Sequence, residues 1–91
     1  MHDEDRARQR VQFIGRCGEA LHGYQWARAL ANDLRMDERG MRRIRAAFHG
    51  AYAFPVGPGL VRDCALLVER RGETVERLLA DLAEFIADEP A

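Results

Sequence analysis

The 91-residue sequence predicts an all-α domain of four to five helices that contains a helix-turn-helix over about residues 25–48. Three observations favour this class. Apolar residues recur every three to four positions along most of the chain, no segment alternates apolar and polar residues as a strand does, and two of the three prolines lie in one stretch, residues 50–59. A chain this short forms one core, so residues 1–91 are expected to be a single domain with frayed tails at 1–4 and 88–91.

Two amphipathic helices are expected before the turn of this motif. The first covers about residues 4–21 and ends at Gly23, and the second covers about residues 25–34, where helix-favouring alanines alternate with other residues. The apolar stripes are Val11, Ile14, Cys17 and Leu21 in the first helix and Trp26, Leu30 and Leu34 in the second.

The third helix is expected to begin after Asp37 and to reach about Phe48. The Asp37 carboxylate is suited to this position because it accepts hydrogen bonds from the free N–H groups of a first helical turn. Residues 50–59 then form a loop, from which Tyr52 or Phe54 is expected to fold back on the core.

The C-terminal part continues the apolar stripe from Leu60 as one kinked helix or as two helices. Gly72 stands between the two halves of the stripe, and Gly costs about 1 kcal/mol relative to Ala inside a helix, which leaves both possibilities open. The second half is wider than a small helical core needs. We therefore expect these C-terminal residues to form a homodimer interface, made by Val75, Leu78, Leu79, Leu82, Phe85 and Ile86.

Composition argues against several classes of protein. No apolar run approaches the ~18 residues of a membrane span, and the charged start lacks the apolar segment of a secretory signal, so we expect a cytoplasmic protein with no membrane partner. Cys17 and Cys64 are in phase with apolar stripes and should be reduced and packed in the core. The histidines are too scattered to bind a metal, and no nucleophile has a partner, so no enzyme activity, metal or cofactor is expected.

The net charge of −1 hides an uneven distribution along the chain. All 14 basic residues are Arg, which a G+C-rich coding bias explains at least as well as function does. Residues 26–50 contain six Arg and three acids, a net charge of +3, whereas residues 51–91 contain four Arg and eight acids, a net charge of −4. This asymmetry is expected when one face of a protein meets phosphates and the rest keeps it soluble.

The apolar pattern of residues 30–44 is typical of a helix-turn-helix. Ala31 is the small residue at which the two helices cross, because close approach there requires a small side chain and an apolar wedge to fill the angle. The wedge positions are Leu30, Leu34, Met36, Met41 and Ile44.

The opposite face of the third helix presents three arginines. At 100° per residue from Met41, Arg39, Arg42 and Arg43 lie at roughly 100–200°, away from the wedge. An Arg in the major groove donates two hydrogen bonds to guanine, so these three are the candidate base-reading residues. Glu38 is placed to pair with Arg42 at i, i+4. The candidate phosphate contacts are Tyr24, Gln25, Arg28, Arg35, Arg45 and His49.

These residues resemble a family of small bacterial and phage helix-turn-helix DNA-binding proteins. The resemblance covers about residues 13–85 and is carried by Trp26, Leu30-Ala31 and Arg39-x-x-Arg42-Arg43, followed by Gly50 and Pro55. It implies sequence-specific binding of double-stranded DNA by the third helix, and often a role as a transcriptional regulator in phage or other mobile elements.

Three residues depart from that family pattern. Arg35 replaces the Gly usual in the turn, where the chain tends to a positive φ, Gly40 replaces a Thr or Ser, and Ile44 replaces a Trp. These changes fit a divergent DNA reader and also a fold that has lost DNA binding. The alternative function is a protein-binding module, such as a small phage-type inhibitor that docks on a host protein complex.

Overall fold

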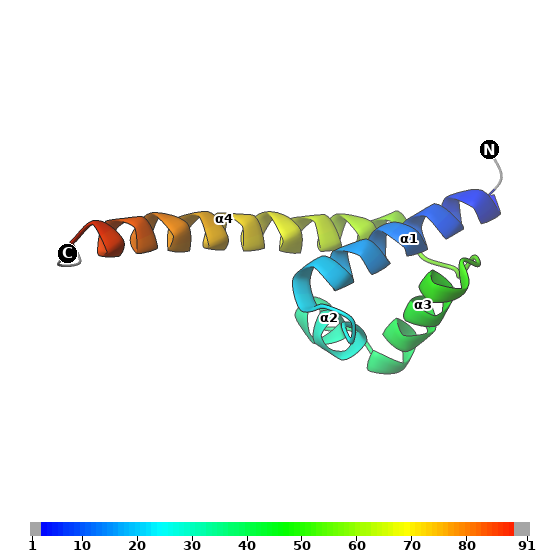
Figure 1. Cartoon of the computed structure of the whole chain (residues 1–91). Helices are drawn as coiled ribbons and strands as arrows, with labels where there is room; N and C mark the ends of the chain where they lie inside the picture. Colours follow the sequence, from blue (N-terminus) through cyan, green and yellow to red (C-terminus); the bar gives the residue numbers. More distant parts are fainter. Residues whose placement is uncertain (1–2, 89–91) are drawn as a thin grey trace.

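The computed structural model describes residues 3–88 as four α-helices, which are shown in Figure 1. The helices are α1 (Asp3–His22), α2 (Ala27–Leu34), α3 (Glu38–Gly50) and α4 (Pro58–Asp88). No strand occurs within residues 3–88, so the predicted all-α class is confirmed, with four helices. Of the end segments expected to fray, Asp3, Glu4 and Asp88 are helical, and residues 1–2 and 89–91 lie outside the described part.

The core lies where α1 packs against the other three helices. The apolar stripes predicted for the first two helices meet there, together with the inner face of α3 and the start of α4. Cys64 belongs to this core, and Cys17 is partly buried against it, as expected. The largest fully buried side chains are Val11, Ile14, Trp26, Leu30, Met41 and Cys64.

Two glycines of α1 allow aromatic side chains to approach its backbone closely. A Cβ at Gly18 would overlap the Trp26 ring, and one at Gly15 would overlap the Phe48 ring. The two rings also meet edge to face, with their centroids 6.1 Å apart. Trp26 therefore packs directly under α1. It is the N-cap residue of α2, so that helix begins at Ala27 and not at residue 25 as predicted.

The turn between α2 and α3 places Arg35 in the left-handed backbone conformation. Arg35 has a φ of 54°, in the left-handed region, and its N–H group donates to the Asn32 carbonyl at 3.2 Å. Asp37 caps α3, because its Oδ2 accepts from the Gly40 N–H at 3.3 Å. The chain thus keeps Arg at a position that favours Gly, while the predicted cap is confirmed.

The C-terminal part is one helix that extends well beyond the core. Gly72 lies within α4, so the single-helix alternative is the one observed. Every residue from 68 to 88 is exposed, and Figure 1 shows this part of α4 projecting from the other helices. The six expected interface residues are all uncovered, from Val75 at 43% exposed to Ile86 at 67%. Among the described residues, no helix combines the length and apolar character that crossing a bilayer requires.

In the loop before α4, Phe54 packs against the core, whereas Tyr52 is 48% exposed and lies against Gly50. Of the two aromatic residues considered, Phe54 is therefore the one that folds back on the core.

Candidate nucleic-acid interface

Helices α2 and α3 are joined by residues 35–37 and cross at a steep angle. In Figure 1, α2 is seen nearly along its axis and α3 from the side. Ala31 is buried at their contact, as the motif requires. The predicted wedge residues all pack into the core, with Leu30, Met41 and Ile44 buried and Leu34 and Met36 half-buried.

The outer face of α3 carries the three candidate base-reading residues. Arg39, Arg42 and Arg43 are all exposed, while Met41, on the opposite face, is buried. This separation follows from the 3.6-residue period of a helix whose inner side fills the wedge. The predicted orientation of the arginines is thus confirmed.

Arg42 also lines an open groove between the start of α2 and α3. Three of the candidate phosphate contacts, Gln25, Arg28 and Arg45, line the same groove. Glu38 supplies a carboxylate there. The fold therefore brings together one base-reading candidate and three phosphate candidates that span 21 residues of sequence.

A single oxygen of Glu38 joins the two helices across this groove. Its Oε1 lies 2.9 Å from Nη2 of Arg42 and 3.3 Å from Nε of Arg28. The first pair is the predicted i, i+4 contact. The second pair was not predicted, because Arg28 and Glu38 lie on different helices and only the crossing angle brings them together.

Tyr24, Arg45 and His49 gather at one edge of the same surface. The Arg45 guanidinium lies over the Tyr24 ring, 5.0 Å from its centroid, and Nη2 donates to the Tyr24 carbonyl at 3.4 Å. The Tyr24 and His49 rings have centroids 5.9 Å apart. Tyr24 nevertheless remains 70% exposed, so this edge is accessible from solvent.

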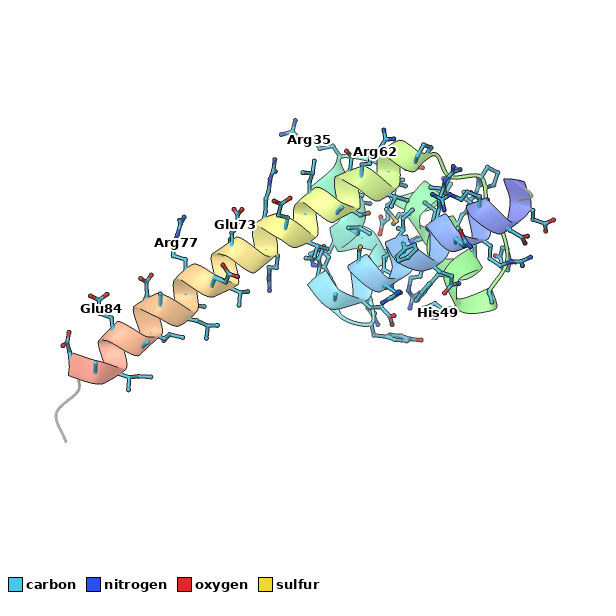
Figure 2. The ribbon with its side chains drawn as sticks, turned by 90° about the horizontal axis from the view of Figure 1, so that it is seen from above. Arg35, His49, Arg62, Glu73, Arg77 and Glu84 are labelled. Carbon is cyan, nitrogen blue, oxygen red and sulfur yellow. The ribbon has the colours of Figure 1, made fainter. Side chains whose placement is uncertain are left out.

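Arg35 stands apart from the other candidates. Figure 2 shows Arg35 and His49 on opposite sides of the body of the molecule. Arg35 lines a separate groove between the turn and α4, where Asp33 and Asp63 contribute carboxylates. The fold therefore does not join Arg35 to the surface that holds the other phosphate candidates.

The two thiols are poorly suited to nucleophilic chemistry. Burial raises the pKa of the Cys64 thiol to about 12, with smaller contributions from the nearby Cys17 and Asp63. Burial also raises the pKa of Cys17, although Arg16 opposes this shift. Both cysteines therefore stay protonated near neutral pH. Within residues 3–88, no group of three His, Cys, Asp or Glu side chains is arranged to hold a metal ion.

The candidate interface is thus the arginine face of α3, together with the groove beside it and the Tyr24 edge. No protein-family model matches this chain, and no curated protein or solved structure matches it.

Proposed function

We propose that this protein is a small transcriptional regulator that binds duplex DNA sequence-specifically through α2, the turn and α3. The observation that carries the proposal is the exposed face of α3, with three arginines opposite a buried wedge that fixes the helix across α2. A major groove about 12 Å wide admits one α-helix, and Arg side chains on such a helix read guanine. The protein would act in the cytoplasm of a bacterium, on genes of that bacterium, of a phage or of another mobile element.

Two of the three base-reading candidates are available without rearrangement. Within residues 3–88, neither Arg39 nor Arg43 forms a salt bridge, whereas Arg42 pairs with Glu38. We therefore assign base contacts first to Arg39 and Arg43. Arg42 would join them, or bind phosphate, once DNA competes with the Glu38 carboxylate.

The start of α2 is suited to hold a backbone phosphate. No side chain caps this helix end, so the N–H groups of its first turn remain available, and Gln25 and Arg28 stand beside them. Arg45 extends this surface onto α3, where its guanidinium lies over the exposed ring of Tyr24. Phosphate contacts of this kind fix the orientation of a recognition helix, while base contacts supply sequence preference.

A homodimer completes the proposed function. One helix-turn-helix reads about half of an operator, and a second copy supplies the other half. The acidic α4 carries the exposed apolar stripe through which the two copies would associate, and its charge keeps it off the DNA.

Fluorescence anisotropy with a random-sequence duplex tests DNA binding. We expect affinity at 50 mM salt that falls steeply by 200 mM, because several phosphates are contacted. Arg39→Ala and Arg43→Ala should weaken binding, whereas Arg77→Ala, on the projecting part of α4, is the matched control and should not. Absence of binding at 50 mM salt, or an equal loss with Arg77→Ala, contradicts the proposal.

The second candidate function is a protein-binding module that docks on a host protein complex. It is favoured by the exposed apolar stripe of α4 and by Glu38, which neutralises part of the arginine surface. This candidate predicts no DNA binding at any salt concentration. The anisotropy measurement therefore separates the two functions directly.

A further inference from the structure

The projecting part of α4, residues 68–88, carries an apolar seam with the spacing of a paired helix. Its residues alternate between intervals of three and four along one face of the helix, which is the seven-residue repeat of a coiled coil. A soluble monomer rarely leaves an apolar stripe like that of residues 75–86 uncovered. The seam consists of Val68, Arg71, Val75, Leu78, Leu82 and Phe85, flanked by Leu79 and Ile86.

Charged residues occupy the other side of the same segment. Figure 2 shows Glu73, Arg77 and Glu84 along one edge of the projecting helix. At 100° per residue, these three residues lie about 160–200° from Val75, on the side opposite the seam. The helix is therefore polar over most of its circumference and apolar only along one stripe, as a surface helix that packs against a single partner is.

We infer that two copies of this chain pair through these segments in antiparallel orientation. The inference rests on the homodimer of the proposed function and specifies its geometry, but it does not depend on DNA binding. Two features of the segment, its charge gradient and the position of Arg71, select this orientation over the parallel one.

The charge gradient favours the antiparallel pair. Residues 69–77 contain three Arg and three acids and have no net charge, whereas residues 78–88 contain three acids and no Arg, a net charge of −3. A parallel pair would set the two acidic halves side by side. An antiparallel pair sets each acidic half beside the half that contains all three arginines, which lowers the repulsion.

Arg71 gives a second, more local reason. It is the one charged residue of the seam, at a position that faces its own copy in a parallel, in-register pair. Two guanidinium groups would then oppose each other inside the interface. Consider instead an antiparallel pair with Val75 beside Leu78 of the second copy. Because both helices rise equally per residue, Arg71 then lies within about one residue of Asp81 of the second copy.

Antiparallel pairing also sets the spacing of the two DNA-binding units. In each copy, α1, α2, α3 and the start of α4 form the body of the molecule. An overlap of about 20 residues keeps the two bodies roughly 30 Å apart at 1.5 Å per residue. Each α3 lies within its body, on the side of α2 away from the projecting segment (Figure 1). The two α3 helices are then farther apart than the ~34 Å of one DNA turn, so the half-sites of an operator should be more widely spaced than that.

Spin labels at three positions along the helix distinguish the orientations. Single cysteines replace Glu69, Arg77 or Glu84, which lie off the seam, in a Cys17→Ala background that leaves only the fully buried Cys64. Pulsed electron spin resonance then measures the distance between the two copies of each label, without DNA.

The antiparallel pair predicts a short distance for the label at position 77, near the centre of the overlap. It predicts an axial separation at least ~20 Å greater for the label at position 69. Three similar distances would indicate a parallel pair and overturn the inference. No interspin distance at any position, with sedimentation as a monomer, would overturn pairing through α4 altogether.

Leu78→Asp in each labelled protein is the control, because a carboxylate beside the apolar Val75 of the second copy should abolish the interspin distances and give a soluble monomer. Circular dichroism confirms that the variant keeps its helices. Because no DNA is present, antiparallel distances in a protein that fails to bind DNA would refute only the proposed function.

Discussion

Replacing Glu38 with Gln removes the carboxylate that holds Arg28 and Arg42 together across the groove between α2 and α3. The amide keeps the size of the side chain but cannot form either ion pair. In the wild-type protein, an incoming phosphate must displace this carboxylate before it can engage either arginine. Glu38→Gln should therefore strengthen DNA binding while it weakens the fold slightly.

The structure sets the magnitude of both effects. The side chains of Arg42 and Arg28 are 68% and 77% exposed, so each pair is worth only about 0.2–1 kcal/mol. Release of both pairs corresponds to roughly a 2- to 30-fold gain in affinity. Loss of the same pairs, and of an acidic residue in the first turn of α3, should lower the free energy of unfolding by about 1 kcal/mol.

Fluorescence anisotropy on a random duplex at 100 mM salt measures the gain, and urea denaturation measures the loss of stability. Glu73→Gln, on the exposed edge of α4, is the matched control for a general change in net charge and should raise the affinity much less. Unchanged or weaker binding by Glu38→Gln would refute the reasoning. Glu38 would then position Arg42 for DNA or contact DNA itself.

Three further predictions concern the fold. Arg35→Gly should raise the free energy of unfolding by about 0.5–1 kcal/mol, because Gly adopts the φ of 54° without strain, and an unchanged urea midpoint would show that the Arg35 side chain compensates. Gly18→Ala should lower the free energy of unfolding by about 1–3 kcal/mol, because the added Cβ overlaps Trp26. Gly72→Ala should raise the free energy of unfolding by up to about 1 kcal/mol, because the space around Gly72 is open. Equal effects of the two substitutions on Tm would contradict this packing. Burial raises the pKa of Cys64 from 9.0 to about 12, so this thiol favours the folded state fully below pH 9 and progressively less between pH 9 and 12. Stability measured across that range should therefore fall more steeply for the wild type than for Cys64→Ala, and parallel curves would exclude the effect.

Much of the fold could be predicted because burial imposes a period on the sequence. The stripes that contain Ile14, Leu30 and Ile44 each occupy one helical face, and each face is buried. Gly72 could not be interpreted in the same way, because its cost of about 1 kcal/mol is small beside the preference of the surrounding Leu, Glu, Arg and Ala residues for helix. The structure resolves this point in favour of one continuous helix.

The candidate site was predictable only in part. The periodicity of α3 places Arg39, Arg42 and Arg43 on one face, and the i, i+4 spacing predicts the pair between Glu38 and Arg42. The contact between Glu38 and Arg28 and the isolation of Arg35 depend on how α2, α3 and α4 cross. Such crossings follow from the packing of whole side chains, which no local pattern encodes.

Sequence-specific reading of DNA by α3 is the central claim, and selection of bound sequences from a random duplex pool tests it most directly. The wild-type protein should enrich a defined consensus at 50 mM salt. Arg39→Ala should relax the preference at one position of that consensus, while Arg77→Ala should enrich the wild-type sequence unchanged. If the wild-type protein enriches no sequence, or if Arg39→Ala selects the same consensus with the same preference at every position, α3 does not read DNA in the way proposed.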